Sequence, residues 1–389
     1  MTTVKHISHW LDAFAPPGLA EAWDNVGLLW GDPEAEVSRI MTCLTVTSHT
    51  ASEAIDERAE LIVSHHPVLF RAVKKVVASH PDNGMLWNLA KAGISILSPH
   101  TAFDNTDGGI NDGLARRLGL VDVFPLRWFA PTGTFKLVVF TPESDRDAVL
   151  SAAFLAGGGR IGAYEQCSYS SLGRGTFFGK ESTKPTVGRA GRPETVEELR
   201  IEVVCPPERL TEILLAVRSA HSYEEPAIDV YPLHFSPTTK GPGAGRVGSL
   251  LKPTMLGQFA AEVAECLGTP GLQYVGDPER PVRRVAVVCG AGDDFLSDAV
   301  NAGADVLLTG EARFHRTLEA EALEIGLIVA GHHATERPGV EDLAARLAAE
   351  FTGLLVWPSS REQDPLRPIR SREKRTPGEI SPGVGSLSE

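Results

Sequence analysis

The sequence predicts an α/β fold with two α/β halves and a smaller domain inserted between them. Short runs rich in Val, Ile and Leu alternate with helical patterns near both ends of the chain, which is typical of mainly parallel sheets. The middle of the chain breaks this alternation. At 389 residues the chain is also long for one compact core, so we expect two or three domains.

The two halves are predicted from apolar runs closed by Gly or Pro, which fit buried strands. The N-terminal half, residues 1–129, begins with an amphipathic helical pattern around Ile7, Trp10, Leu11 and Phe14. Its strands are expected near 40–47, 61–64 and 94–98, with helices between them. In the C-terminal half, residues 239–358, we expect helices over 255–267 and 295–302 and strands over 285–289, 306–309 and 327–330.

The inserted domain is expected over residues 130–238. Its pattern predicts a strand at 135–141, a helix at 145–155, two strands around 164–178, a strand at 199–205, a helix at 207–220 and a strand at 227–231. A βα unit followed by ββαβ is typical of a ferredoxin-like, split-βαβ module. Such a module could be a sensor, a lid over a site or a spacer.

The C-terminal residues 359–389 are predicted to be a disordered tail. The segment is polar and carries Pro365, Pro368, Pro377 and Pro382 without an apolar period. Such a segment cannot bury enough apolar surface to offset the entropy of ordering it.

Composition narrows the class of protein. The net charge of −13 argues against general nucleic-acid binding through a basic surface. No run of about 20 apolar residues predicts a membrane span, and the N-terminus lacks a signal-peptide pattern. The five cysteines are scattered without a CxxC pair, so we expect reduced thiols and a cytoplasmic location.

Four of the apolar runs end at residues that can bind a metal ion. The run ends are Ser64-His65-His66-Pro67, Pro99-His100 with Asp104 four residues on, Gly310-Glu311, and Gly331-His332 with Glu336 four residues on. Ligands in open α/β sheets collect at the carboxyl ends of strands, so these segments can share one crevice. His, Asp and Glu without thiolate fit Zn²⁺, Mn²⁺, Fe²⁺ or Co²⁺ almost equally well.

Two of these motifs favour a pair of ions. Neighbouring strand side chains point to opposite faces, so His65 and His66 can serve one site only if Pro67 breaks the strand there. Two imidazoles that diverge from one turn suit two metal ions about 3.5 to 4 Å apart. Glu336 could bridge them with its two oxygens. The alternatives are an ordinary structural histidine and a carboxylate favoured near a helix N-terminus.

The motifs resemble one known family. Together with Trp23-Asp24-Asn25-Val26-Gly27-Leu28 and His315, they are similar over residues 1–358 to the dinuclear metal-centre proteins called GTP cyclohydrolase 1 type 2 homologues, or NIF-three-like proteins. The resemblance implies two similar α/β halves that form the metal-site domain. It also implies that His65, Asp104 and Glu336 hold one ion, and His66, His332 and the shared Glu336 the other. Members are commonly ring-like homohexamers, most simply trimers of dimers.

The insert resembles the extra domain of the longer bacterial members. Its motif His221-Ser222-Tyr223-Glu224-Glu225-Pro226 is the basis of that resemblance, which implies a fold similar to PII-type signalling and divalent-cation-tolerance proteins.

The function we expect is a dinuclear metal-dependent hydrolase acting on a nucleotide or another small phosphorylated substrate. His100 and His315 are candidates for proton transfer or for orienting the ligands, and ligand support alone is equally compatible with their positions. Arg246, within Gly243-Ala244-Gly245-Arg246-Val247-Gly248, could face an anionic substrate. The alternative is a non-enzymatic metal-binding scaffold or regulator with a ligand-sensing insert.

Overall fold

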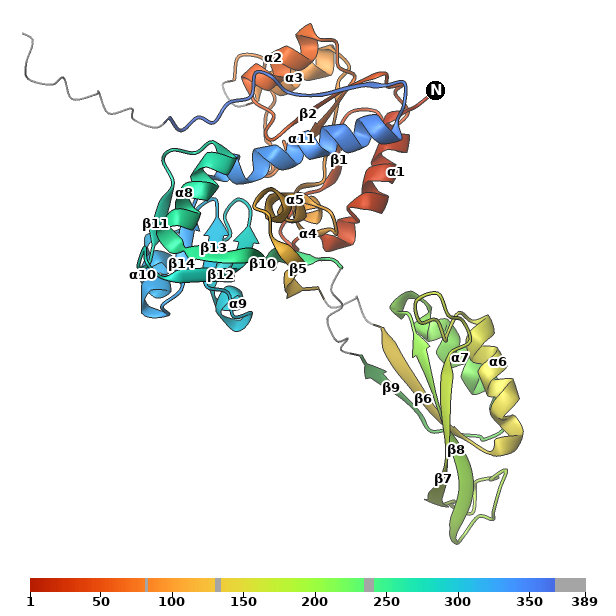
Figure 1. Cartoon of the computed structure of the whole chain (residues 1–389). Helices are drawn as coiled ribbons and strands as arrows, with labels where there is room; N and C mark the ends of the chain where they lie inside the picture. The colour runs from red at the N-terminus through yellow and green to blue at the C-terminus, as the bar shows by residue number, and fades with distance from the viewer. Residues whose placement is uncertain (81–82, 130–133, 234–240, 368–389) are drawn as a thin grey trace, which may run out of the picture. The chain divides into compact units, whose positions relative to one another are not determined.

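The computed structural model describes residues 1–80, 83–129, 134–233 and 241–367. The chain divides into two compact units, one formed by Met1–Trp128 with Thr239–Glu389 and the other by Phe129–Thr238 (Figure 1). The described residues form eleven α-helices and three sheets, which confirms the predicted α/β class. No helix among them is long and apolar enough to cross a membrane.

The first sheet of the larger unit has the strand order β1-β4-β3-β2-β15. These strands are β1 (Gly27–Trp30), β2 (Arg39–Cys43), β3 (Leu61–Ser64), β4 (Ser95–Ser98) and β15 (Leu355–Pro358). All neighbours are parallel except β1, which pairs antiparallel with β4. Every residue of β3 and β4 is buried, because helices cover both faces of the parallel centre. The helices of this region are α1 (Val4–Phe14), α2 (Ser48–Asp56) and α3 (Gly84–Lys91).

The second sheet of this unit has the order β11-β14-β13-β12-β10-β5. Its strands are β5 (Val121–Trp128), β10 (Gly243–Met255), β11 (Gln273–Val275), β12 (Pro281–Val288), β13 (Val306–Thr309) and β14 (Gly326–Val329). Strands β12, β13 and β14 are parallel, and β10 and β11 pair antiparallel with the two ends of that group. The accompanying helices are α8 (Leu256–Leu267), α9 (Leu296–Asn301) and α10 (Phe314–Ala322).

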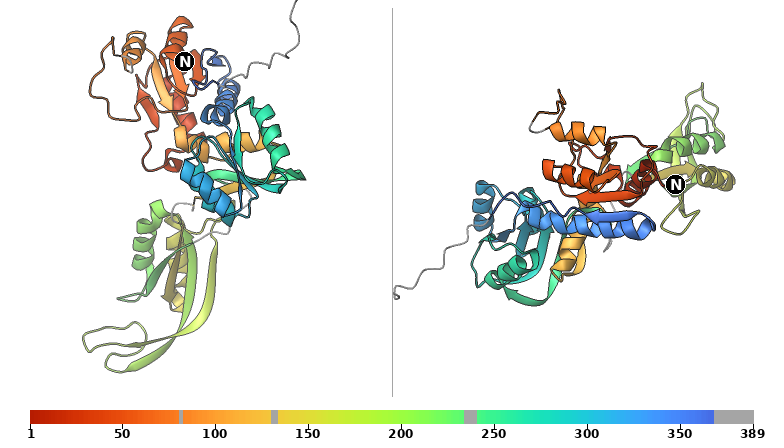
Figure 2. Two further views of the ribbon diagram at one scale, coloured as in Figure 1. Left: turned by 90° about the vertical axis from the view of Figure 1, so that its left-hand side faces the viewer. Right: turned by 90° about the horizontal axis from the view of Figure 1, so that it is seen from above.

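The two sheets share part of one plan: each contains three successive parallel strands, β2-β3-β4 and β12-β13-β14, with a short antiparallel strand beside the third. In each, the last parallel strand leads directly into a helix: β4 into α4 (His100–Asn105), followed by α5 (Ile110–Arg117), and β14 into α11 (His332–Glu350). Helix α11 runs between the two sheets in both views of Figure 2. One apolar core contains residues of both, including Val63, Val287 and Leu343 of α11. The site described below lies where these two helices begin.

The smaller unit is built from β6 (Phe135–Thr141), α6 (Arg146–Leu155), β7 (Ser168–Phe178), β8 (Pro193–Cys205), α7 (Leu210–Ala220) and β9 (Ile228–Pro232). Its antiparallel sheet has the order β7-β8-β6-β9, the split-βαβ arrangement. The two strands expected around 164–178 are in fact one long strand, β7, because residues 168–178 pair without interruption with β8. Only a single bridge joins Ile161 to Tyr164. The likeness to PII-type proteins remains a prediction.

The start of the C-terminal tail is placed differently by sequence and structure. Residues Ser359–Glu362, here called the strap, were expected to be disordered. In the structure they bind Glu53 of α2, and the carboxylate of Glu362 binds the backbone that follows β2. Glu53, which is 2% exposed, accepts hydrogen bonds from Ser359 Oγ and from the backbone N–H groups of Ser360 and Arg361. Glu362 binds the first sheet, as described below. The polar composition of this segment gave no indication of these contacts. Residues 368–389 of the predicted tail lie outside the described residues.

Removal of the inserted unit should leave the metal-site unit folded. The insert joins β5 to β10, and Trp128 pairs with Gly243 in antiparallel register, so a short turn can connect these strands. We expect a variant with residues 129–242 replaced by Asn-Gly to remain cooperatively folded and to bind metal like the parent. Circular dichroism and elemental analysis measure both properties. Insoluble protein or loss of metal would show that the insert is part of the core.

Candidate metal centre

The five predicted ligand residues meet at one place in the larger unit. The residues that line a cavity of about 600 Å³ include His66, Asp104, His332 and Glu336. His65 lies beside Asp104 and Glu336. The histidine pair directly follows strand β3, and Asp104 and Glu336 are each the fifth residue of their helices, α4 and α11. The carboxyl ends of parallel strands from both sheets therefore converge, as the sequence predicted.

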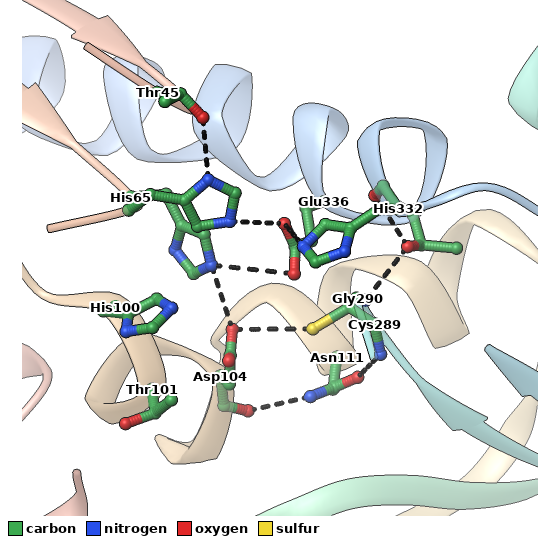
Figure 3. A network of polar contacts seen from close by, with 12 residues as sticks. Thr45, His65, His100, Thr101, Asp104, Asn111, Cys289, Gly290, His332 and Glu336 are labelled. Carbon is green, nitrogen blue, oxygen red and sulfur yellow. Dashed lines mark hydrogen bonds and ion pairs between the residues drawn. The ribbon is translucent and has the colours of Figure 1, made fainter. Parts of the chain in front are cut away.

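Glu336 lies at the middle of the cluster and is 4% exposed. Its Oε2 atom is 3.0 Å from Nε2 of His66 and 3.0 Å from Nε2 of His332 (Figure 3). Its Oε1 atom lies 3.9 Å from Nε2 of His65, and that nitrogen is 3.5 Å from Oδ1 of Asp104. One carboxylate thus faces two separate sets of ligand atoms.

The histidine rings are oriented by partners on their Nδ1 atoms. The Thr45 hydroxyl lies 2.7 Å from Nδ1 of His66, and a Glu311 oxygen lies 3.0 Å from Nδ1 of His332. Fixing one ring nitrogen presents the other to a metal and sets its tautomer. In both rings Nε2 is the nitrogen that faces Glu336.

His65 provides the test of whether a metal fits here. Its side chain is 1% exposed, and neither ring nitrogen has a hydrogen-bond partner among the described residues. A buried polar atom without a partner is costly, and a cation held with Asp104 and Glu336 would satisfy Nε2. Burial lowers the pKa of His65 well below its usual range, which keeps the ring neutral and able to coordinate. The residues present therefore fit a metal ion.

Two triplets in the described residues could each hold an ion: His65, His66 and His100, and His66, His332 and Glu336. Burial, followed by the charge of Glu336, raises the pKa of Asp104 to about 7 in the metal-free chain. Burial would also raise the pKa of Glu336, but hydrogen bonds from His332 and His66 hold it well below its usual range. A bound cation would lower the pKa of Asp104 as well, because it offsets the repulsion between the carboxylates.

His100 belongs to this cavity, whereas His315 does not. The ring of His100 lines the cavity, and its Nδ1 donates to Oδ1 of Asp24 at 2.6 Å. Asp24 comes from the Trp23-Asp24-Asn25 motif, whose structural role the sequence did not reveal. His315 is exposed on α10 and is absent from the cavity lining, because β13 ends at Thr309 and the chain has already turned into this outer helix. The structure therefore does not bring His315 to this cavity, and its role at the site stays a prediction.

Arg246 was expected to face a substrate but is buried, at 1% exposure. Its guanidinium binds both oxygens of Asp112, at 2.8 and 2.7 Å, and donates to the carbonyl oxygens of Gly243, Gly245 and Thr106. These bonds leave Arg246 no donor for a ligand. It joins α5 to β10 instead.

The strap provides further support that the sequence did not reveal. The Glu362 carboxylate accepts the backbone N–H groups of Leu44 and Thr45, at 2.8 and 2.7 Å. It also pairs with Arg337, 3.3 Å away, which follows Glu336 on α11. Glu362 therefore ties the Thr45 segment, whose hydroxyl orients His66, to the helix that carries Glu336.

Gly290 lets the loop after β12 approach the ligands. Its φ is +60°, and a Cβ atom there would overlap Oε1 of Glu336 and lie 3.2 Å from Nε2 of His332. Gly268, the residue after α8, has a similar φ of +65° with nothing within 4 Å of the same position. Both glycines therefore have a left-handed backbone conformation, but only Gly290 lies against metal-ligand candidates.

We therefore expect Gly290→Ala to displace Glu336 and reduce bound metal, while Gly268→Ala leaves the metal content unchanged. Both substitutions should lower the free energy of unfolding by about 1 kcal/mol, the usual cost of a left-handed non-glycine residue. Elemental analysis and denaturant unfolding measure these effects. Equal metal content in the two variants would contradict the close approach at Gly290.

Comparison with known proteins decides the family. The sequence model described as Duf34/NIF3 (NGG1p interacting factor 3) matches residues 2–365. The chain belongs to this family. Over 351 residues, the Duf34/NIF3 chain is 35% identical to the GTP cyclohydrolase 1 type 2 homolog of Halalkalibacterium halodurans, which covers 89% of this chain and 92% of that protein. It is 36% identical over 345 residues to the homolog of Mycobacterium tuberculosis, with coverage of 88% and 90%.

Solved structures agree with this Duf34/NIF3 assignment. A Bacillus cereus protein related to NIF3 has a TM-score of 0.68 at 33% identity, over 95% of this chain and 99% of that chain. A Staphylococcus aureus protein has a TM-score of 0.77 at 26% identity, with the same coverage. The family resemblance seen in the motifs is therefore confirmed, and the family match extends beyond residue 358 through the strap.

Proposed function

We propose that the protein is a dinuclear metal-dependent hydrolase of a nucleotide or another small phosphorylated molecule, similar to a GTP cyclohydrolase 1 type 2 enzyme. The observation that carries the proposal is the position of Glu336, whose Oε2 faces His66 and His332 while its Oε1 faces His65. His65, Asp104 and Glu336 would hold one ion, and His66, His332 and Glu336 the other. Two divalent ions so held would supply Lewis-acid polarisation and activate water near neutral pH.

The chain's own residues would orient the ligands and move protons. Asp24 accepts a hydrogen bond from Nδ1–H of His100, so Nε2 is the ring nitrogen left free for proton transfer. The same Asp24 accepts from the Thr101 backbone N–H at 3.1 Å, which fixes the start of α4 and the direction of Asp104. Proton transfer by His100 is thus available at the wall of the cavity.

The cavity supports a small planar substrate with an anionic part. Its volume of about 600 Å³ lies within the range of small-molecule sites. Trp23 and Phe70, both at least half exposed, meet edge to face at 5.9 Å and offer aromatic surface on which a base can stack. Arg127 also lines the cavity and is held by Asp298. The relatives named GTP cyclohydrolase 1 type 2 homolog make guanine nucleotides the first substrates to test.

Turnover assays on metal-free and metal-loaded protein test the proposal. Zn²⁺, Mn²⁺, Fe²⁺ and Co²⁺ would each be supplied, with GTP, other nucleotides and phosphodiesters as substrates. Formate release reports imidazole-ring opening, and phosphate or alcohol release reports phosphoester hydrolysis. We expect metal-dependent turnover that Glu336→Gln abolishes. Failure of every substrate with a fully loaded centre would contradict the hydrolase and favour a non-enzymatic metal-binding scaffold or regulator.

A specific observation supports that second function: the inserted unit has a cavity of its own. A regulator would need such a site to sense a ligand. The coordination spheres distinguish the two functions, because a catalytic ion keeps an open position and a structural ion does not. Exchangeable water at the ions, measured by relaxation of Mn²⁺-loaded protein, would favour the hydrolase.

We also propose assembly into a homohexamer, most simply a trimer of dimers. Phe314 and Leu318 on α10 are 70% and 47% exposed, and Trp23 and Trp87 are also exposed, as expected of interface residues. Trp30, by contrast, packs against the core of the first sheet. Light scattering at micromolar concentration should give a mass near six times 41.7 kDa. A mass of one chain would exclude the ring.

A further inference from the structure

The inserted unit contains a cavity of about 300 Å³ with no assigned role. It lies among β7, β8, the segment 183–187 and the turn before β9. Its apolar wall is formed by Phe140, Phe177, Pro185, Val187 and Ala227. Tyr223, Glu224 and Glu225 of the sequence motif close one side. An apolar cavity with a few convergent polar groups is the usual form of a small-molecule site.

Two polar groups face each other inside this cavity. The Tyr223 hydroxyl is buried and has no hydrogen-bond partner among the described residues. Burial and the neighbouring Glu198 carboxylate raise the pKa of Tyr223 well above its usual range, so the hydroxyl keeps its proton. A buried hydroxyl without a hydrogen-bond partner destabilises the fold, and a hydrogen bond to a ligand atom would offset that cost. The Glu198 carboxylate therefore lies close enough to the Tyr223 hydroxyl to act on it.

The cavity has a negative charge that its surroundings leave partly uncompensated. Glu198, Glu224 and Glu225 line it, and no basic side chain does so in the described part of the chain. Glu225 pairs with Arg218 at 3.2 Å, and Glu224 accepts the Lys184 backbone N–H at 2.8 Å. Glu198 forms no ion pair with the described residues. It is the carboxylate left to bind a cation.

A glycine on the neighbouring strand leaves room for the Glu198 carboxylate. On β7, a Cβ atom at Gly175 would overlap Oε2 of Glu198, so the missing side chain provides the space for this carboxylate. On the opposite side, Thr186 Oγ1 donates to the Ser222 carbonyl oxygen at 2.7 Å. The Tyr223 backbone N–H donates to Nδ1 of His221 at 3.1 Å. These contacts hold the turn and the segment 183–187 together around the cavity.

We propose that this cavity binds a small organic cation, a primary amine with an apolar body, whose ammonium group lies between Glu198 and Tyr223. The ammonium donates one hydrogen bond to the Glu198 carboxylate and one to the Tyr223 oxygen, which pairs both groups. The apolar body contacts Phe140, Phe177 and Val187, where it is removed from water. A hydrated metal ion lacks the apolar surface that this wall would bury.

Calorimetric titration of the full-length chain tests the site with defined probes. Phenethylammonium has the expected chemistry, and 2-phenylethanol is its neutral counterpart of similar shape. We expect the amine to bind at least roughly tenfold more tightly than the alcohol, as for a hydrogen bond to a charged group. Glu198→Gln should remove this preference, and Tyr223→Phe should weaken amine binding several-fold. Gly175→Ala, which displaces the Glu198 carboxylate, should act like Glu198→Gln.

Glu197→Gln is the matched control, because it makes the same change one residue away on a side chain that is 70% exposed and outside the cavity lining. It should bind the amine like the parent. Equal affinity for amine and alcohol, or an amine preference that survives in both Glu198→Gln and Gly175→Ala, would overturn the proposal. So would displacement of the amine by millimolar Mg²⁺ or Mn²⁺, which would identify a metal site instead. Circular dichroism confirms that each variant is folded.

Discussion

Replacing Glu336 with Gln is expected to lower metal affinity at both halves of the centre. The change keeps the shape of the side chain but removes the charge shared by the two sets of ligands. It also places an NH₂ group where one oxygen faced His65 or His66. Removing outer hydrogen-bond partners of metal ligands typically costs about 10- to 100-fold in affinity, so the loss of a shared ligand should exceed about 100-fold. Elemental analysis after dialysis against a weak chelator should find less than one ion per chain.

The matched control is Glu350→Gln, which changes an exposed carboxylate at the other end of α11. It should retain the parent's metal content. Retention of two ions by Glu336→Gln at unchanged affinity would contradict the proposed bridging role. Selective loss of one ion would show that the carboxylate belongs to a single site.

Glu362→Gln should weaken the half of the centre that contains His66 more than the half that contains Asp104. The carboxylate accepts two backbone N–H groups and pairs with Arg337, whereas the neutral amide has one acceptor oxygen. The Leu44–Thr45 backbone would then lose its anchor, and the Thr45 hydroxyl would no longer fix Nδ1 of His66. We expect a loss of about 10- to 100-fold in the affinity of one ion.

Titration of metal-free protein with Co²⁺, followed by absorption, can resolve the two binding steps. Asp364→Asn is the control, because in the described part of the chain this nearby carboxylate accepts only the Leu366 N–H, within its own turn. It should leave both steps unchanged. Equal weakening of both steps by Glu362→Gln would indicate a general effect on folding, and no change would show that Thr45 orients His66 without the strap.

The contacts that orient the ligands could not be predicted because they join distant parts of the chain. Glu362 binds residues more than 310 positions away in the sequence, and Asp24 binds His100 across 76 positions. Nothing local distinguishes these carboxylates from ordinary surface residues. The polar composition after Pro358 predicted disorder, although buried acceptors for that segment exist elsewhere in the fold. His315 shows the converse. It is close to Glu311 in the sequence, but it lies on α10 and does not line the cavity.

The sequence by itself determined the α/β class, the strand ends and the set of residues that meet at the cavity. Hydrophobic periodicity is a local property, and the carboxyl ends of parallel strands converge in any such sheet. Only the tertiary structure decided how those residues act. It buried Arg246 against Asp112, placed Glu336 between two sets of ligands and left the Tyr223 hydroxyl facing Glu198. The burial of a side chain and its hydrogen-bond partners depend on which surfaces pack together. The hydrophobic periodicity of a single segment does not determine that packing.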